Sequence, residues 1–169
     1  LTIITQDHPG LFSRIAGAVT MAGCQVVYAR INTRKDGTIL DEFMIQTLEK
    51  SSVKEPETLF RIKKMIDDTL AGKIILSEQL GKKTKTISKR QKAMLTVPRV
   101  TITNQMSNTH TVLEISGPDR PQLLYDLTRK IAQLGLQIKS ASVSTYGDRA
   151  VDVFYVKDIF GMKIKTDMM

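Results

Sequence analysis

The chain has 169 residues, of which 41% are hydrophobic and 5% aromatic, and its formal net charge is +8. Because single domains usually run to about 100 to 150 residues, this length suits one ordinary domain or two small ones. The chain lacks the run of roughly 18 uncharged apolar residues that a membrane span requires, and residues 1–10 lack the basic flank and cleavage site of a signal peptide. The single cysteine, Cys24, lies in an apolar run and predicts a buried thiol in a reducing compartment. We therefore expect a cytoplasmic protein without membrane contact.

The positive charge is concentrated in one segment. Residues 72–92 contain seven lysines and arginines but a single acid, Glu78, and the rest of the chain is nearly neutral. No Phe, Tyr or Trp lies between Phe60 and Tyr125, so the basic segment offers no such ring on which a nucleic-acid base can stack. We interpret residues 72–98 as a helical and basic linker and expect no nucleic-acid binding. An acidic protein partner, or another part of a longer chain, is the alternative use of this charge.

The most informative feature is an internal repeat at an offset of 112 residues. The recurring identities are Asp7, Pro9, Leu11, Gly23, Gln25, Ala29 and Thr33, which match Asp119, Pro121, Leu123, Gly135, Gln137, Ala141 and Thr145. After the next turn the offset becomes 111, which pairs Asp41 with Asp152 and Phe43 with Phe154. The repeat predicts two copies of one small structural unit.

The first copy predicts an alternation of strands and helices. Alternating apolar side chains predict strands at residues 1–5, 25–33 and 39–47. Apolar side chains at helical spacing predict helices at residues 11–22, 56–70 and 74–80. Gly23 is expected to end the first helix, and Asp36-Gly37 to form a hairpin turn. Residues 99–104 alternate again and are a candidate for the fourth strand of this copy.

The second copy repeats this order with strands at residues 111–116, 137–146 and 151–157. Its helix covers residues 123–134, Gly135 ends that helix, and Gly147-Asp148 forms the hairpin turn. Residues 160–169 predict the start of a second helix, so the copy is truncated after its third strand. The predicted fold is α+β: tandem ferredoxin-like βαββαβ modules with antiparallel sheets, at residues 1–71 and 111–169.

Several strings in both copies carry a resemblance to a known family. In the first copy they are Asp7-His8-Pro9-Gly10-Leu11-Phe12, residues 15–18, and residues 29–31 with Asp36-Gly37; in the second they are residues 119–128, 135–138 and 146–156. These strings resemble tandem ACT domains, which are small amino-acid-sensing modules attached to metabolic enzymes. They are most similar to the carboxy-terminal pair of the bacterial bifunctional protein-PII uridylyltransferase/uridylyl-removing enzymes.

The resemblance implies a non-catalytic fragment that senses glutamine in nitrogen regulation. The parent enzyme would transfer UMP from UTP, with Mg²⁺, to the PII signalling protein and would remove it again. The implied partners are L-glutamine, PII, the catalytic regions of the same parent chain and a second copy in a homodimer through ACT–ACT pairing. No cofactor or metal is expected in this fragment.

The turn into the first helix of each copy has the chemistry that an amino acid requires. A free amino acid carries a carboxylate beside an ammonium, so its site must hold an anion and a cation. Unpaired N–H groups around Gly10 and Leu11, at the positive end of the helix dipole, suit the carboxylate, and Asp7 suits the ammonium. The candidate ligand-binding residues are Asp7, His8, Pro9, Gly10, Leu11 and Phe12 in the first copy, and Asp119, Arg120, Pro121, Gln122 and Leu123 in the second.

Other interpretations of these residues stay open in the sequence. Asp7 and Asp119 can instead cap the helices that follow them. Gln122 replaces the glycine of the first copy, so its amide either blocks the second turn or lines it. For the aspartates within apolar strands, Asp41 and Asp152, the sequence favours cross-strand partners over a ligand role, with Arg149 a candidate for Asp152.

Two other functions compete with a PII-enzyme sensor. One is an ACT pair of another amino-acid metabolic enzyme or of a stand-alone regulator. The other is an RNA-binding ferredoxin-like module, which requires exposed aromatic residues on the central strands. Phe43 and Phe154 are instead expected in the core, which leaves Tyr155. The sequence contains no metal-spaced histidine or cysteine cluster, phosphate loop or nucleophile elbow, so it does not favour an independent enzyme.

Overall fold

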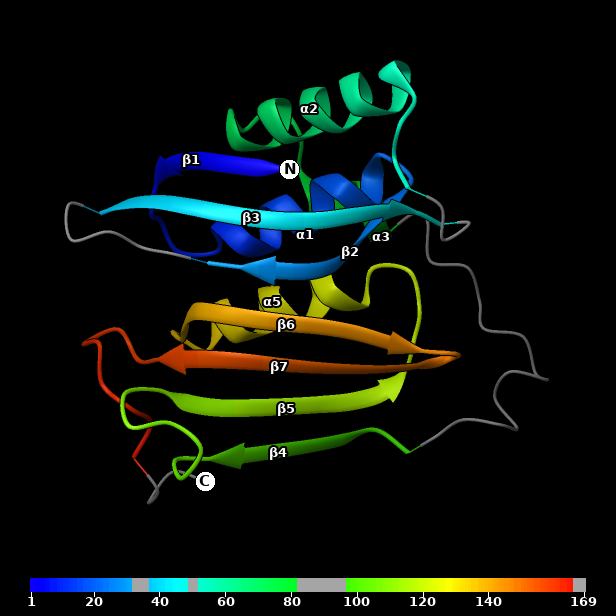
Figure 1. Ribbon diagram of the computed structural model, residues 1–169. Helices are drawn as coiled ribbons and strands as arrows, with labels where there is room; N and C mark the ends of the chain where they lie inside the picture. Colours follow the sequence, from blue (N-terminus) through cyan, green and yellow to red (C-terminus); the bar gives the residue numbers. More distant parts are fainter. Residues whose placement is uncertain (32–36, 49–51, 82–96, 166–169) are drawn as a thin grey trace.

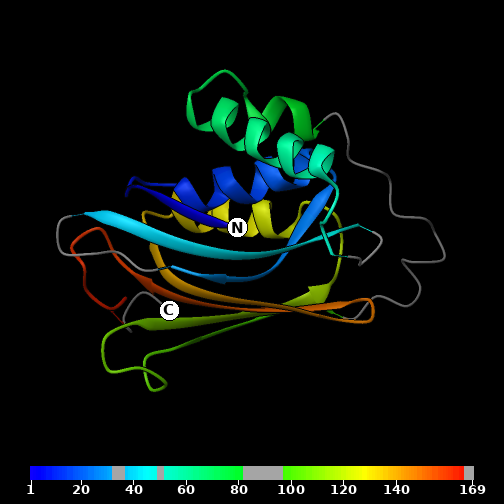
Figure 2. The same cartoon turned by 45° about the horizontal axis from the view of Figure 1, so that its top comes forward.

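The computed structural model describes residues 1–31, 37–48, 52–81 and 97–165. Within these ranges, seven strands form one antiparallel sheet in the order β1-β3-β2-β6-β7-β5-β4 (Figure 1). The strands are β1 (Thr2–Gln6), β2 (Cys24–Arg30), β3 (Thr38–Thr47), β4 (Arg99–Thr103), β5 (Thr111–Pro118), β6 (Gln137–Tyr146) and β7 (Arg149–Lys157). The helices are α1 (Leu11–Met21), α2 (Pro56–Leu70), α3 (Leu76–Gly81) and α5 (Leu123–Gln133), and they gather on one face of the sheet (Figure 2).

The two copies of the repeat join edge to edge through their second strands. β2 of the first copy pairs with β6 of the second at Ala29 and Ala141. These alanines are equivalent in the repeat and are both buried. Because each position meets its own counterpart, the junction has the self-complementary form of a two-fold interface. The predicted tandem of antiparallel α+β modules is confirmed.

The boundaries of several elements agree with the sequence. α2 covers the predicted residues, and the predicted inward face of α1 is buried, including Ile15 and Val19. Gly23 and Gly135 follow α1 and α5 with φ values of +75° and +74°, the left-handed conformation that ends a helix without strain at glycine. Phe43, 3% exposed, and Phe154, fully buried, are core residues as expected.

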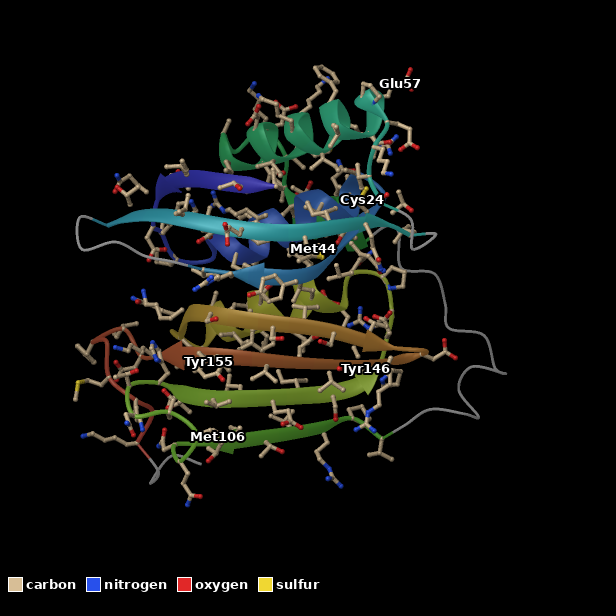
Figure 3. All side chains as sticks on the ribbon, viewed as in Figure 1. Cys24, Met44, Glu57, Met106, Tyr146 and Tyr155 are labelled. Atoms are coloured by element: carbon tan, nitrogen blue, oxygen red, sulfur yellow. The ribbon has the colours of Figure 1, made fainter. Side chains whose placement is uncertain are left out.

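The sheet has one face covered by helices and one open face. Phe12 of α1 stacks on Phe43 of β3 with ring centroids 5.7 Å apart, which fixes that helix over the first copy. Met44 and Tyr155, adjacent in sequence to the buried Phe43 and Phe154, project from the open face (Figure 3). None of the helices in the described ranges is long and apolar enough to cross a membrane.

The predicted place of residues 99–104 is wrong. β4 pairs with β5, with Val100 opposite Ile115 and Ile102 opposite Leu113, at the outer edge of the second copy. Alternation identifies a strand but carries no information about its neighbour. The short connection from β4 to β5 favours pairing between these consecutive strands. The second unit of the sheet therefore begins at Arg99, twelve residues before the predicted start at Thr111.

The helical part of the predicted linker belongs to the packed structure. Leu76 and Leu80 of α3 are buried against Tyr125 of α5, so α3 joins the first copy to the second. Apolar spacing over six residues was enough to predict a helix but not its packing partner. The basic run at residues 82–92, the turn residue Asp36 and residues 166–169 lie outside the described residues.

The predicted helix at residue 160 is absent from the described residues up to 165. The Asp158 carboxylate accepts the backbone N–H groups of Phe160 at 2.9 Å and Met162 at 2.8 Å, which stabilises a turn instead. The chain then runs beside β5, where the Ile164 N–H donates to the Thr111 hydroxyl at 2.9 Å. These local side-chain bonds compete with the backbone bonds of a helix.

Candidate functional site

A small pocket of about 40 Å³ lies where the two copies meet on the helix-covered side. The turn before α5 forms one wall, with Asp119, Arg120, Pro121, Gln122, Leu123 and Leu124. The first copy contributes Ala16, Thr20, Cys24, Gln25, Val26 and Leu48, and the sheet of the second copy contributes Val143, Thr145, Ala150 and Asp152. The pocket therefore has walls from both copies.

The turns before α1 and α5 have the same backbone conformation. Gly10 and Gln122 stand directly before their helices with φ values of 78° and 72°, both left-handed. Neither helix has a side-chain cap, so the interpretation of Asp7 and Asp119 as caps is wrong. Each aspartate lies three residues before the left-handed residue and four before the first residue of its helix, so its carboxylate is not at the capping position.

The predicted residues of the first turn do not converge on one site: some lie at the surface and others lie in the hydrophobic core. The Asp7 carboxylate forms an ion pair with Nζ of Lys139 from β6 at 3.5 Å. His8 Nδ1 lies 3.3 Å from the Pro9 carbonyl oxygen on the surface. Leu11 and Phe12 lie in the hydrophobic core, 4% and 6% exposed, so their side chains face away from solvent.

The first backbone N–H group of each helix is not available to a ligand, contrary to the expectation from the sequence. The Leu11 N–H is not unpaired: it donates to the His8 carbonyl oxygen at 3.2 Å, and the Leu123 N–H donates to the Arg120 carbonyl oxygen at 3.1 Å. The reason is that each turn closes on itself through an i to i+3 bond before the helix begins. An anion at the second turn would therefore be held by the later amides of the first helical turn, beginning with Leu124.

The second turn brings its predicted residues together at the pocket. Asp119, Arg120, Pro121, Gln122 and Leu123 all line it. The Arg120 guanidinium is held by the Asp126 carboxylate at 2.6 Å, with both side chains about two-fifths exposed, at 38% and 42%. In the described part of the chain, the Asp119 carboxylate makes no ion pair or hydrogen bond.

Asp152 of β7 also lines the pocket, although it lies outside the two turns. It is 2% exposed, and its Oδ1 has no hydrogen-bond partner among the described residues. The predicted partner is wrong, because Arg149 donates to the Ser116 hydroxyl at 3.1 Å instead. The signal in the sequence was an aspartate among the apolar residues of a strand.

The environment of Asp152 favours its neutral form. Its pKa is raised to about 7, first by burial and then by the negative charge of Asp119, against the lowering effect of a backbone hydrogen bond from Ser144. Burial also raises the pKa of Cys24, which lines the same pocket and is labelled in Figure 3. Among the described residues, no group of three or more His, Cys, Asp or Glu side chains is placed to hold a metal ion.

Gln122 is under backbone strain, and this leads to a stability prediction. In the described chain it is the one residue other than glycine with a positive φ. A left-handed residue with a Cβ costs roughly 1 to 2 kcal/mol, partly offset by the greater freedom of glycine in the unfolded chain. We expect Gln122→Gly to raise the free energy of unfolding in urea by about 0.5 to 1 kcal/mol. The matched variant Gly10→Gln should lower it, and a loss of stability in Gln122→Gly would show that the amide side chain stabilises the fold.

Comparisons with known proteins agree with this architecture. The family description "ACR9-like, ACT-like domain" matches residues 99–167, so the match begins at β4, as the second unit of the sheet does. A bifunctional uridylyltransferase/uridylyl-removing enzyme of Rhodospirillum rubrum is 48% identical over 96% of this chain and 17% of its own length. Enzymes of the same description from Gluconobacter oxydans and Azospirillum brasilense are each 46% identical over 97% of this chain.

The relatives are much longer than this chain, which spans 17 to 18% of their length. Their similarity nevertheless covers both copies of the repeat and the pocket between them. Residues 99–167 therefore match an ACT-like domain, and nearly all of the chain is similar to one segment of the bifunctional uridylyltransferase/uridylyl-removing enzymes.

Proposed function

We propose that this chain is a regulatory module that binds L-glutamine in the pocket between its two copies. The observation that carries the proposal is the composition of that pocket, in which the start of α5, two carboxylates and amide and hydroxyl side chains converge. The carboxylate of the ligand would lie at the start of α5, where the helix dipole favours an anion. Gln25 and Thr145 offer hydrogen-bonding partners for a side-chain amide.

The pocket must widen to hold the ligand. Its volume of about 40 Å³ is enough for a few water molecules, each of which needs roughly 10 to 15 Å³, but not for a ligand of about ten heavy atoms. Gln122 and Arg120 are half-buried side chains at its wall, and their rotation would enlarge it. Since α1 and β2 form the opposite wall, a bound ligand would change how the two copies pack.

This coupling is the proposed route of regulation. A ligand that binds one packing of the two copies better than another shifts their equilibrium toward it. In a parent enzyme of the uridylyltransferase type, the shift would reach the catalytic regions and set the balance between UMP transfer to PII and its removal. Mg²⁺ and UTP would belong to those regions, and pairing of ACT modules in a homodimer is part of the same proposal. The lone buried Cys24 suits a cytoplasmic location.

Isothermal titration calorimetry tests the proposal. A ligand of about ten heavy atoms, at about 0.4 to 0.6 kcal/mol per atom, should bind with a dissociation constant from millimolar to tens of micromolar. We expect heat with L-glutamine and much weaker heat with D-glutamine, whose ammonium and side chain cannot both reach their partners. A folded sample that gives no heat with several millimolar L-glutamine would contradict the proposal.

A further inference from the structure

The two turns differ in whether a cation lies beside their aspartate. At the first turn, the Lys139 ammonium lies 3.5 Å from the Asp7 carboxylate, and the lysine side chain is 23% exposed. The repeat places Val27 at the position equivalent to Lys139. The second turn therefore has an apolar side chain where the first has a cation, and Asp119 has no ion-pair partner in the described part of the chain.

A second carboxylate faces the pocket at that turn. Asp152 is 2% exposed, lines the pocket, and has an Oδ1 without a hydrogen-bond partner among the described residues. The charge of Asp119 contributes to the raised pKa of Asp152, which means that the two carboxyl groups act on each other. A buried carboxylate oxygen without a hydrogen-bond partner is unfavourable, even though Asp152 also accepts a backbone hydrogen bond from Ser144, and a cation between the two carboxyl groups would remove that cost.

The nearby basic side chains are engaged elsewhere. Arg120 lines the same pocket, but its guanidinium is held by Asp126 at 2.6 Å. Arg149 begins the strand that carries Asp152, but it donates to the Ser116 hydroxyl at 3.1 Å. Neither arginine is therefore available to Asp119 and Asp152, and a cation between these two carboxylates must come from a bound ligand.

We propose that Asp119 and Asp152 together hold the α-ammonium group of the amino acid, and that Lys139 fills the equivalent place at the first turn with its own ammonium. This inference rests on the proposed function and adds two statements to it. The ligand must carry a free primary ammonium group, and each chain binds one ligand, at the second turn. Asp152 is the deep contact, Asp119 is the outer one, and the internal ion pair of Asp7 keeps the first turn closed.

Calorimetry on the 169-residue chain tests each part, with thermal unfolding to confirm that every variant is folded. We expect the unsubstituted chain to bind one L-glutamine and to reject N-acetyl-L-glutamine, which has no ammonium. Asp119→Asn should weaken binding by about 10- to 100-fold, as expected for a lost hydrogen bond to a charged group. Asp7→Asn, the matched change at the first turn, should alter the dissociation constant by less than about threefold.

Lys139→Val replaces the lysine beside the first turn with valine, the residue that stands at the equivalent position, Val27, for the second turn. We expect this variant to bind two L-glutamine molecules per chain instead of one. A stoichiometry that stays at one would overturn the role given to Lys139. If the unsubstituted chain binds L-glutamine but Asp119→Asn or N-acetyl-L-glutamine binds equally well, the ammonium site is wrong while the proposed function stands. If the unsubstituted chain gives no heat at all, the proposed function itself fails.

Discussion

Asp152→Asn should stabilise the protein at pH 8 by about 4 kcal/mol and change its stability little at pH 4. The folded chain raises the pKa of Asp152 from 3.8 to about 7, chiefly by burial. The stability that the neutral carboxyl group contributes is therefore fully present below the pKa of the unfolded chain, 3.8. It is lost as the pH rises through the pKa of the folded chain, about 7. Asparagine keeps the neutral shape at every pH, so its advantage should grow between pH 4 and pH 7 and then level off.

Urea denaturation at several pH values measures this difference directly. Asp148→Asn, in the exposed turn between β6 and β7, is the matched control for replacing one carboxylate with an amide. Equal destabilisation by Asp152→Asn at pH 4 and pH 8 would mean that the carboxylate is stabilised in the fold and would contradict the description of its environment. The same variant should bind L-glutamine more weakly, since it loses the charge proposed to hold the ammonium.

Gly17→Ala should destabilise the protein by about 1 to 3 kcal/mol. An added Cβ would lie 2.6 Å from Cδ1 of Leu76 and 2.8 Å from Cδ2 of Tyr125, closer than atoms in contact can approach. Tyr125 belongs to α5 and is 6% exposed, so it has little room to move. The substitution should therefore push apart α1 and α5, the two helices that hold the copies together.

The control for this substitution is Gly81→Ala, where an added Cβ meets nothing within 4 Å and the backbone is not left-handed. Urea denaturation should show a loss of stability for Gly17→Ala and nearly none for Gly81→Ala. Because α1 and the start of α5 form opposite walls of the pocket, Gly17→Ala should also weaken glutamine binding. An unchanged unfolding free energy would show that the helices separate without cost.

The fold could be predicted from the sequence because the repeat supplied the same information twice. Each helix carried one apolar face and ended at a glycine, and each strand alternated, so the order of elements followed directly. The neighbours of an element were harder to predict. The alternation of β4 gave no indication that it joins β5, and the apolar spacing of α3 did not show that it packs on Tyr125.

The candidate site could be predicted only in part. The chemistry of the Asp-x-Pro turn identified both turns, and the second of them lines the pocket. The sequence favoured the first turn because Gly10 leaves the helix start open, but it could not show that Lys139 lies beside Asp7. These residues are 132 positions apart and meet only because β2 and β6 pair. For Asp152 the sequence favoured a cross-strand partner over a ligand role, since its burial and its proximity to Asp119 depend on the fold.

The measurement that tests the proposed sensing site most directly is the change in backbone amide NMR signals when L-glutamine is added. We expect the largest changes at residues 119–125 of the second turn and at the facing residues of the first copy, Thr20 and Gln25. Residues 7–12 of the first turn should change little, because the Lys139 ammonium already occupies the place beside Asp7. Changes centred on residues 7–12, with none at the second turn, would contradict a glutamine site between the two copies.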